Sequence, residues 1–490
     1  MQSVARILFL SFLSILVVYL LVFQIQAIWR FTIDDMYITL RYAKYWDSHG
    51  VLLWNMGEVP VEGYSNFSFL LIARFLEWLQ IDPVFGLKMV GVASLLGLSI
   101  GIFLLTKHLA GIRYAVIPVI WLLMYRGQVI WAVSGLETTF YQCVLIFAVY
   151  HLLKALEYQS TQDISTAGVL FALLALTRPE GSVLALGYFL VYGAYAFRQP
   201  NFKLRCFYLI GFFAIVYFPY FFWRWFYFGY LFPNSVYCKA TSTEFMGVLD
   251  ARYLKLAWPF LCCTLPLLRQ PSYRRVYSFL ILPSVFYLVF CWTSDPVVAF
   301  DNRLFLPALA LLFSLATLGL ASAVQQPRLV YVLSAVLLFC AIPKMSLEAY
   351  RHFTKNPAAG ERLRREVSHW LSKYAHPKQN IVLADSGLIP YLHPELNFID
   401  SYCLNNLEMG HTPIAERYTH FCQTLLDRHP SYIILTAWIH DGYTEYTPAD
   451  MCLKKVLSET AQYQLLNVFR SDNPDHTTYQ YMLFGLKSPV

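Results

Sequence analysis

Long apolar segments recur through the first 340 residues of the chain and are separated by short polar loops. A helix needs about 20 apolar residues to span a bilayer. Residues 164–197 are apolar except for TRPEG at 177–181, where Pro179 and Gly181 break a helix, so we expect two short helices there. Together they give eleven spans, the other nine near residues 7–29, 84–106, 115–126, 139–156, 206–223, 251–268, 276–293, 304–323 and 328–343.

The last 145 residues have a different pattern, typical of a soluble domain. Residues 361–374 place Leu363, Val367 and Leu371 on one face of a helix. Residues 379–387 and 431–439 read as buried strands, and strands that alternate with helices indicate an α/β domain. We therefore predict a polytopic α-helical membrane domain over residues 1–345 and a small soluble α/β domain over residues 346–490.

Composition supports a membrane protein. The chain is 58% hydrophobic and 14% charged, with a mean hydropathy of +0.48, whereas soluble domains contain about 25% charged residues. Its net charge of +7 does not indicate a nucleic-acid partner, because the cations lie in short loops between predicted spans. Residues 7–29 are too long for a signal peptide and lack a small-residue cleavage site, so we expect a retained first span.

The basic loops predict the orientation. Loops 107–114, 198–205, 269–275 and 325–328 all fall on one side of the eleven-span arrangement, which the positive-inside rule makes cytoplasmic. The other polar loops and the tail then lie on the extracytoplasmic side. Ten cysteines are scattered without metal-binding spacing. If the tail lies outside the cell, a disulfide can form among Cys403, Cys422 and Cys452, although three cysteines cannot all pair with one another.

An acid pair, Asp34 and Asp35, follows the first apolar segment and begins a polar stretch that extends to residue 66. On a helix, adjacent side chains point about 100° apart, so the two acids cannot hold one ligand together. One of them could contact a reacting hydroxyl. The alternative is helix capping, since Thr32 and Asp35 have the S/T-x-x-D/E spacing. The position at a membrane boundary favours a functional role.

Other polar and aromatic residues accompany this pair. Ile38, Tyr42 and Tyr45 recur at helical spacing beside Arg41, which predicts a helix on the membrane surface with its apolar side down, or an interfacial anchor. The segment VEGYSN reads as a polar turn. The candidate substrate-binding residues are Arg41, Tyr42, Glu62, Tyr64, Asn66, Glu137, Arg178, Glu180, Asn234, Tyr237, Lys239 and Arg303.

The later candidates are charged or aromatic residues near the ends of predicted spans. Glu137, Arg178 and Glu180 either pair with one another or contact substrate. The loop with Asn234, Tyr237 and Lys239 offers aromatic faces for sugar rings and cations for a phosphate. Arg303 is placed to meet an anionic headgroup, or else reaches the interface as an ordinary flanking cation.

Signatures of soluble enzymes are missing from the sequence. It contains no P-loop, G-x-G-x-x-G, G-x-S-x-G or HExxH motif, and the histidines of the tail are too scattered for a metal site. We therefore expect no cofactor and no metal, and a divalent cation is not indicated.

The stretch TIDDMYITLRYAKYWDSHGVLLWNMGEVPVEGYSNF resembles the first signature of a bacterial group of C-type (GT-C) membrane glycosyltransferases, which includes the terminal β-arabinofuranosyltransferase of mycobacterial arabinan. The segments SGLETTFYQ, ALTRPEGS, YFGYLFPNSVYCKA and NRLFLPALALL resemble its later motifs in the same order, and IVLADSGLIPYLHPELNFIDSYCLNN resembles the start of its extracytoplasmic tail. The similarity runs from about residue 32 to 406. Met36 replaces the usual small residue, and the tail beyond about residue 410 departs from the group.

The resemblance implies an enzyme of the bacterial inner membrane that moves a sugar from a polyprenyl-phosphate carrier to an extracytoplasmic glycan or glycolipid. Asp34 or Asp35 would match its catalytic acid pair. One direct displacement would invert the anomeric centre, with the base assigned to either aspartate and phosphate contacts assigned, in descending order, to Arg303, Arg178, Lys239 and Arg41. The alternatives are a transporter or flippase of a lipid-linked sugar and a structural scaffold.

Overall fold

The computed structural model describes residues 18–19, 21–239, 246–296, 298–440, 443–471 and 477–487. The chain divides into two compact units. One, here called the helical unit, comprises Met1–Trp29, Lys88–Phe221 and Thr243–Tyr350. The other, the sheet unit, comprises Arg30–Leu87, Phe222–Ser242 and Arg351–Val490. This division places the first polar stretch in the same unit as the tail. The predicted single boundary at residue 345 would separate the two.

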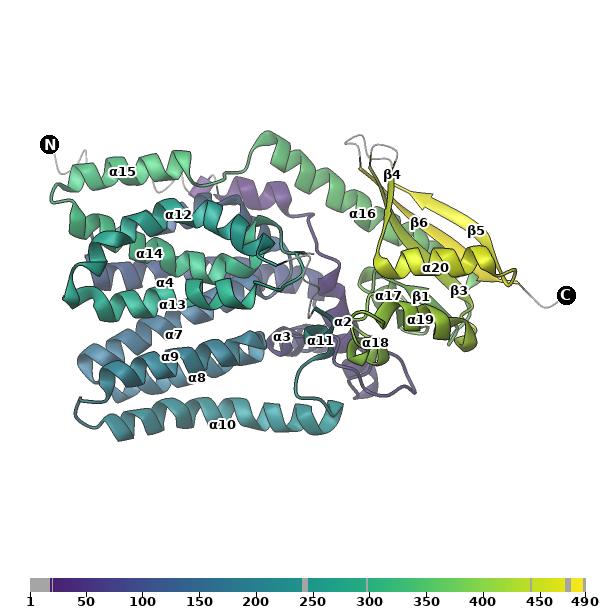
Figure 1. Ribbon diagram of the computed structural model, residues 1–490, viewed down its shortest axis with the longest axis horizontal. Helices are drawn as coiled ribbons and strands as arrows, with labels where there is room; N and C mark the ends of the chain where they lie inside the picture. The colour runs from purple at the N-terminus through teal and green to yellow at the C-terminus, as the bar shows by residue number, and fades with distance from the viewer. Residues whose placement is uncertain are drawn as a thin grey trace. The chain divides into compact units, whose positions relative to one another are not determined.

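The helical unit is a bundle of helices that run side by side, as α7, α8, α9, α12, α13 and α14 do in Figure 1. Helix α14 is buried along nearly its whole length, as expected for a helix that is apolar on every face, and it packs against α5, α7, α12 and α13. The helices that lie wholly or mainly in this unit are α4 (Pro83–Ala110), α5 (Ile117–Met124), α6 (Arg126–Val133), α7 (Thr138–Tyr158), α8 (Thr161–Thr177), α9 (Glu180–Ala196), α10 (Phe202–Phe228), α12 (Val248–Leu268), η2 (Pro271–Tyr273), α13 (Arg274–Phe290), η3 (Phe300–Phe305), α14 (Leu306–Ala323) and α15 (Pro327–Cys340).

Within the described residues, four helical segments are long and apolar enough to cross a membrane: Pro83–Ala110, Thr138–Tyr158, Phe202–Phe228 and Phe300–Ala323. Thr161–Thr177 and Pro327–Cys340 are shorter apolar helices. The predicted break at TRPEG is confirmed, because α8 ends at Thr177 and α9 begins at Glu180, with Arg178 in extended backbone before Pro179.

The predicted span at 115–126 is wrong. Extended backbone at Tyr125 separates α5 from α6, and each of these helices has 8 residues, a length of about 12 Å. A bilayer core is about 30 Å thick. The count of eleven spans is therefore not confirmed, and most of the predicted first span, 7–29, lies outside the described residues. The assignment of loops to the two sides of a membrane stays a prediction.

The sheet unit contains a mixed sheet in the order β2-β1-β3-β6-β5, with β4 paired to the end of β3. Strand β1 runs parallel to β2 and β3, whereas the β3–β6, β5–β6 and β3–β4 pairs are antiparallel. The strands are β1 (Asn380–Leu383), β2 (Asn397–Asp400), β3 (Tyr432–His440), β4 (Tyr443–Tyr446), β5 (Tyr463–Arg470) and β6 (Thr477–Leu486).

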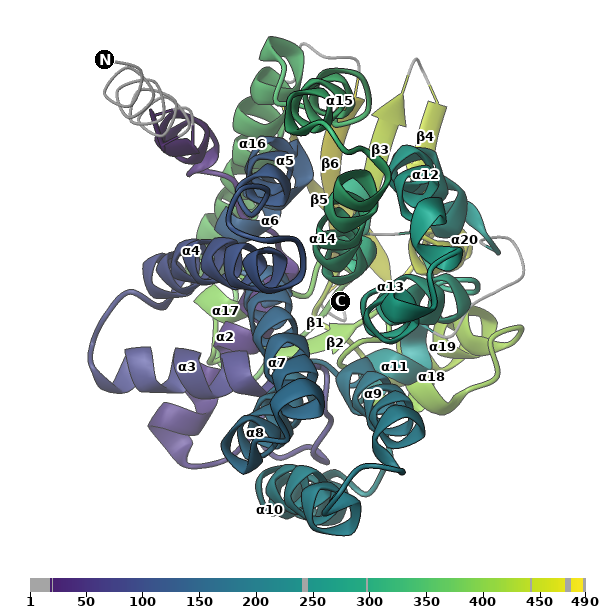
Figure 2. The same cartoon turned by 90° about the vertical axis from the view of Figure 1, so that its left-hand side faces the viewer.

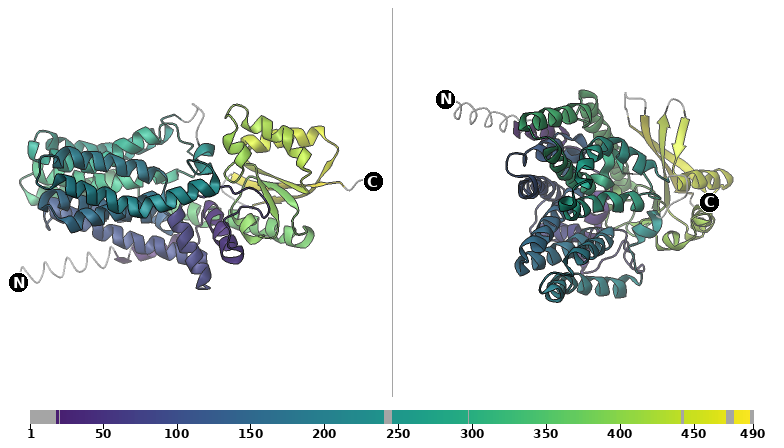
Figure 3. Two further views of the ribbon diagram at one scale, coloured as in Figure 1. Left: turned by 90° about the horizontal axis from the view of Figure 1, so that it is seen from below. Right: turned by 60° about the vertical axis from the view of Figure 1, so that its left-hand side comes forward.

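Helices lie on both faces of this sheet (Figure 3). Ile433 and Leu435 of β3 join a core with Phe421 of α19 (Arg417–Leu425) and Leu453 of α20 (Pro448–Glu459). Alternation along β3 turns Tyr432 to the opposite face, where its ring lies 5.3 Å from Trp370 of α16 (Leu347–Tyr374). The predicted helix at 361–374 and both predicted strands are thus confirmed, as is the small α/β domain in the tail.

The first polar stretch also belongs to the sheet unit. It forms α2 (Asp35–His49) and α3 (Phe67–Trp78), and α2 lies beside α3 and the short helix α17 (Leu388–Leu392) (Figure 2). Arg41, Tyr42 and Tyr45 of α2 are all buried by protein. The prediction of a helix lying on the membrane surface is therefore wrong. Two further short helices complete the unit, α11 (Asn234–Lys239) and α18 (Leu407–His411).

Candidate functional site

The acid pair stands at the start of α2. Asp34 is the N-cap residue, and its side chain makes no capping hydrogen bond. The Thr32 hydroxyl donates to Oε2 of Glu361 at 3.0 Å and not to an N–H of the helix. The capping explanation of the Thr32 and Asp35 spacing is therefore wrong, and both acids are left for other roles.

Asp34 is held by the tail of the chain. Its Oδ1 accepts a hydrogen bond from the Leu388 N–H at 3.0 Å and lies 3.3 Å from Nε of Arg364. Gly387 packs directly against it, since a Cβ there would stand 2.2 Å from the Asp34 carbonyl oxygen and 2.3 Å from Oδ2. The turn that receives Asp34 thus requires a glycine at 387.

Arg364 continues the contact into the sheet. Its Nε and Nη2 donate to Oδ2 of Asp385, at 3.2 and 3.1 Å, and the Tyr481 hydroxyl of β6 donates to the same oxygen. Asp385 lies two residues after the end of β1. We call Asp34, Arg364, Asp385 and Tyr481 the Asp34 network. An ion pair and hydrogen bonds in this network connect the start of α2 to α16, to the residues after β1 and to β6.

Burial raises the pKa of Asp34 to about 6, while the Arg364 guanidinium opposes the rise and Asp385 and Asp35 add to it. Asp34 therefore changes charge close to neutral pH. Asp35 is in a different environment. Its side chain is half-buried, and its carboxylate makes no hydrogen bond or ion pair with the residues that the structure describes. Of the two adjacent acids, Asp34 is thus anchored, whereas the Asp35 carboxylate has no hydrogen-bond or ion-pair partner among the described residues.

Arg41 is a structural residue. A guanidinium has five N–H donors, and all five are used: Nε donates to the Trp54 carbonyl, Nη1 to the Pro390 and His393 carbonyls, and Nη2 to Oδ1 of Asn55 and the Leu396 carbonyl. No donor remains for a phosphate. The proposal of Arg41 as a phosphate ligand is therefore wrong.

Tyr42 is likewise part of the core of the sheet unit. Its hydroxyl lies 2.8 Å from the Val61 carbonyl and accepts the Gly63 N–H at 3.2 Å, and its ring meets that of Tyr64 edge-on at 5.1 Å. Asn66 precedes α3 and accepts the Thr39 hydroxyl at 2.8 Å. These contacts are internal, so the residues position the first polar stretch.

Glu62 is paired in the interior of the same unit. Its Oε2 lies 2.7 Å from Nε of Arg224, and the two side chains are 2% and 4% exposed. Gly63 follows it because a Cβ at this position would stand 1.8 Å from Oδ1 of Asn405. The segment VEGYSN is therefore buried packing, not the exposed polar turn that its composition predicts.

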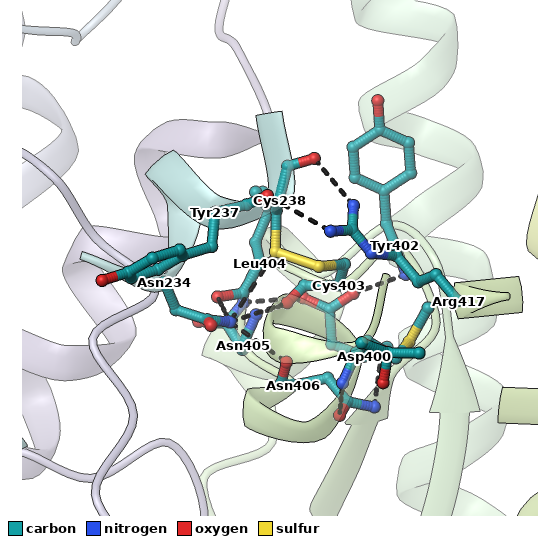
Figure 4. The surroundings of a disulfide bond; sticks show 12 residues. Asn234, Tyr237, Cys238, Asp400, Tyr402, Cys403, Leu404, Asn405, Asn406 and Arg417 are labelled. Carbon is teal, nitrogen blue, oxygen red and sulfur yellow. Dashed lines mark hydrogen bonds between the residues drawn. A yellow bond between two sulfur atoms is a disulfide. The ribbon is translucent and has the colours of Figure 1, made fainter. Parts of the chain in front are cut away.

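Helix α11, Asn234–Lys239, is fastened to the tail (Figure 4). A disulfide joins Cys238 to Cys403, and the Asn234 side-chain amide lies within 2.9–3.1 Å of the carbonyls of Cys403, Leu404 and Asn406. Arg417 donates to the Tyr237 and Cys238 carbonyls. Lys239 is exposed at the end of α11.

A second disulfide joins Cys422 to Cys452. The prediction of a disulfide within the tail included three of the four bonded cysteines, Cys403, Cys422 and Cys452, and lacked Cys238 from the membrane-flanking loop. A disulfide pairing cannot be deduced from spacing alone.

Four candidates meet in the helical unit. Oε1 of Glu137 accepts Nη1 of Arg178 at 2.8 Å and Nη2 of Arg303 at 3.3 Å, and Arg178 also pairs with Glu180. Arg303 stands over the Trp131 ring, with 4.9 Å from Cζ to the ring centroid. Glu137, Arg178 and Glu180 therefore form the ion pairs that were one of the two predicted alternatives. We call these three residues and Arg303 the Glu137 cluster. Its two arginines and two glutamates balance in charge.

The predicted residues thus fall into two sets, one in each unit. Arg364, Asp385 and Tyr481 were not among the predicted residues. Asp385 stands in IVLADSG, near the carboxyl end of the predicted strand 379–387, which is a usual place for a functional polar residue. Among the described residues, no group of three His, Cys, Asp or Glu side chains could hold a metal ion.

Comparisons with known proteins agree with this architecture. A family described as a domain of unknown function (DUF8728) matches residues 350–484. No sequence among the curated proteins matches the chain. Among solved structures, ArnT from Cupriavidus metallidurans bound to undecaprenyl phosphate superposes with a TM-score of 0.61 and 11% identity over 96% of this chain and 98% of that one.

Two further solved structures have the same fold. The oligosaccharyltransferase AglB from Archaeoglobus fulgidus, in complex with an inhibitory peptide and a dolichol-phosphate, gives a TM-score of 0.55 and 10% identity over 95% of this chain and 80% of that one. The mycobacterial arabinofuranosyltransferase AftD gives 0.52 and 11%, over 98% of this chain and 42% of that one. The ArnT and AglB structures each contain a bound lipid phosphate, undecaprenyl phosphate in the first and dolichol-phosphate in the second.

Proposed function

Since the chain has the fold of the C-type (GT-C) glycosyltransferases, we propose that it transfers a sugar from a polyprenyl-phosphate carrier to a glycan or glycolipid outside the cytoplasm. The observation that carries the proposal is the match over 96% of this chain and 98% of ArnT, a structure bound to undecaprenyl phosphate. One acid of the pair at the start of α2 supplies the general base.

The reaction needs few protein groups. A sugar phosphate contains its own leaving group, so a direct displacement forms the bond from the acceptor oxygen to the anomeric carbon as the bond to the phosphate oxygen breaks. The acceptor hydroxyl gives its proton to a carboxylate. Cations stabilise the charge that develops on the departing phosphate. One such displacement inverts the anomeric centre.

Asp35 is the general base in this proposal. A general base needs an oxygen within hydrogen-bond reach of the acceptor hydroxyl, and the Asp35 carboxylate has no hydrogen-bond or ion-pair partner among the described residues. Oδ1 of Asp34, by contrast, is bound by Leu388 and Arg364. Asp34 therefore acts as a positioning residue that fixes the first turn of α2.

Arg303 and Arg178 are the proposed phosphate ligands, followed by Lys239. Glu137 contacts both guanidinium groups and so orients them together. Arginine suits this role because its planar group binds phosphate oxygens in pairs.

The proposed location is the bacterial inner membrane, with the sheet unit on the extracytoplasmic side. Two observations support it. Disulfides persist in oxidising compartments, and both disulfides lie in the sheet unit. The basic loops predicted to be cytoplasmic at 107–114, 198–205 and 269–275 all belong to the helical unit.

The test uses the purified full-length protein with a panel of polyprenyl-phosphate pentoses and hexoses. We expect release of polyprenyl phosphate that depends on an added acceptor glycan, with an inverted anomeric centre in the product by NMR. In a second arm, the protein is placed in vesicles. Movement of an intact lipid-linked sugar across the bilayer without release of polyprenyl phosphate would overturn the proposal in favour of a flippase.

A further inference from the structure

The sheet unit contains a cavity that none of the roles above uses. Its volume is about 400 Å³, and ligand-binding pockets range from about 300 to 1,000 Å³. All three chain segments of the sheet unit contribute to its lining: the first polar stretch from Asn55 to Val61, the loop at Tyr230, and the tail from Phe398 to Arg428. We infer that this cavity binds a short, uncharged oligosaccharide.

One wall of the cavity is aromatic. Tyr230 and His411 stack with 4.0 Å between ring centroids and 21° between ring planes, and Phe398 adds a further apolar surface. The Tyr230 hydroxyl and the His411 ring nitrogens make no hydrogen bond with the part of the chain that the structure describes. Such side chains present an apolar body and a free polar tip. Sugar rings have the matching character, with C–H faces and hydroxyl edges.

The floor of the cavity is polar and rigid. It consists of Asp400, Asn405 and Asn406, and Oδ2 of Asp400 accepts both the backbone N–H and the side-chain amide of Asn405, at 2.8 and 2.9 Å. The Cys238–Cys403 disulfide fixes the same loop, as Figure 4 shows. A site whose floor is held by a disulfide and by hydrogen bonds is preformed, which lowers the entropic cost of binding.

The charges at the cavity favour an uncharged ligand over a phosphate. Arg428 is paired with Glu408, which also contacts His420 at 3.0 Å, so the cation of the lining is already neutralised. Glu58 and Asp400 bring the acids of the lining to three. Partial burial and the nearby Arg417 lower the pKa of His411, which favours the neutral form of its ring. An anion would meet acidic side chains and no unpaired cation in the described lining.

The inference rests on the proposed function in one respect, namely that the oligosaccharide bound here belongs to the acceptor. Binding itself is independent of catalysis. The probes are uncharged arabino-, galacto- and manno-oligosaccharides of two to four units, added to full-length protein in detergent and followed by saturation-transfer NMR. Inorganic phosphate and a short uncharged peptide are the competing probes. Transfer kinetics with the same oligosaccharides as acceptors form a second readout.

Truncation of Tyr230 to alanine should weaken binding of the preferred oligosaccharide about fivefold. It should raise the acceptor KM by the same factor and leave kcat and the thermal midpoint unchanged. The matched control is Tyr374→Ala, a half-exposed tyrosine on α16 that does not line the cavity. Its affinity should equal that of the unmodified protein.

Three results would overturn the inference: no binding of any oligosaccharide, equal loss in the two tyrosine variants, or displacement of the sugar by phosphate or peptide. Oligosaccharide binding that depends on Tyr230 but is not accompanied by transfer from any polyprenyl-phosphate sugar would leave the cavity assignment intact and contradict the proposed function instead.

Discussion

Nε of Arg364 lies 3.3 Å from Oδ1 of Asp34, and Nη2 of the same side chain lies 3.1 Å from Oδ2 of Asp385. One guanidinium therefore lies between two carboxylates that come from distant parts of the chain, and it offsets part of their negative charge. Without it the two acids would face each other in a buried position, where each disfavours ionisation of the other. The charge on Asp34 thus depends on residues of the tail.

This arrangement predicts opposite pH effects for two substitutions. Arg364→Met removes the cation that lowers the pKa of Asp34, so that pKa rises above about 6. Protonation of Asp34 weakens its positioning of the first turn of α2, so the acid limb of kcat/KM that this loss produces moves to higher pH by about one unit. Asp385→Asn removes an acid that raises the same pKa, so the acid limb moves to lower pH. The measurement is the pH–rate profile between pH 4.5 and 8.5.

Arg365→Met is the matched control for this pair. Arg365 is the next residue on α16, and it pairs with Glu361 at 2.7 Å, outside the Asp34 network. Its profile should coincide with that of the unmodified protein. A shift in the same direction for Arg364→Met and Asp385→Asn would refute the coupling.

The acid pair should divide into a catalytic and a positioning member. Asp35→Asn should lower kcat by at least about 100-fold, the range expected for loss of a general base, without a change in thermal midpoint. Asp34→Asn should keep part of the activity but lower the thermal midpoint, because it loses the charged contact with Arg364. Initial rates and melting curves measure both. The reverse pattern would assign the base to Asp34.

The Glu62–Arg224 pair should contribute strongly to stability. Glu62→Gln leaves the Arg224 guanidinium buried without its counterion, which costs about 3–5 kcal/mol. Thermal unfolding of the purified protein measures the loss. Glu58→Gln, an exposed acid of the same segment, serves as the control and should have little effect. If Glu62→Met combined with Arg224→Met were no more stable than Glu62→Gln alone, the stranded charge would not be the cause.

The disulfides predict a count of reactive thiols. The chain has ten cysteines, and six of them are free: Cys143, Cys206, Cys262, Cys263, Cys291 and Cys340. Denatured protein should therefore bind six maleimide groups without reductant and ten after reduction, by intact mass. Cys238→Ser should leave Cys403 reactive and cost about 2–4 kcal/mol of stability. Ten labels without reductant would contradict both bonds.

Local patterns in the sequence predicted local structure well. Pro179 and Gly181 marked the break between α8 and α9, and the apolar runs of the tail marked β1 and β3. Such features depend on neighbouring residues, which the sequence displays directly. The break at Tyr125 has a weaker signal, because the extended residue is neither glycine nor proline. The apolar run ends only after it, at Arg126, Gly127 and Gln128, the first residues of α6.

Long-range contacts were the part that could not be predicted. Apolar positions at helical spacing look the same whether lipid or protein covers them, so Tyr42 and Tyr45 indicated a membrane-surface helix although the tail of the chain buries them. Arg41 looked like a phosphate ligand for the same reason, since its carbonyl acceptors at Pro390, His393 and Leu396 lie far along the sequence. The Asp34 network was missed because two of its members come from segments that resemble ordinary helix and strand.

The composition of the sheet unit has a consequence for how the protein is made. Arg41 emerges early in synthesis, but its acceptors at Pro390, His393 and Leu396 are translated hundreds of residues later, and Cys403 likewise follows Cys238. An unpaired guanidinium is too costly to bury. The first polar stretch must therefore remain unfinished until nearly the whole chain has been synthesised, and residues 346–490 expressed alone would expose the surface that α2 normally covers.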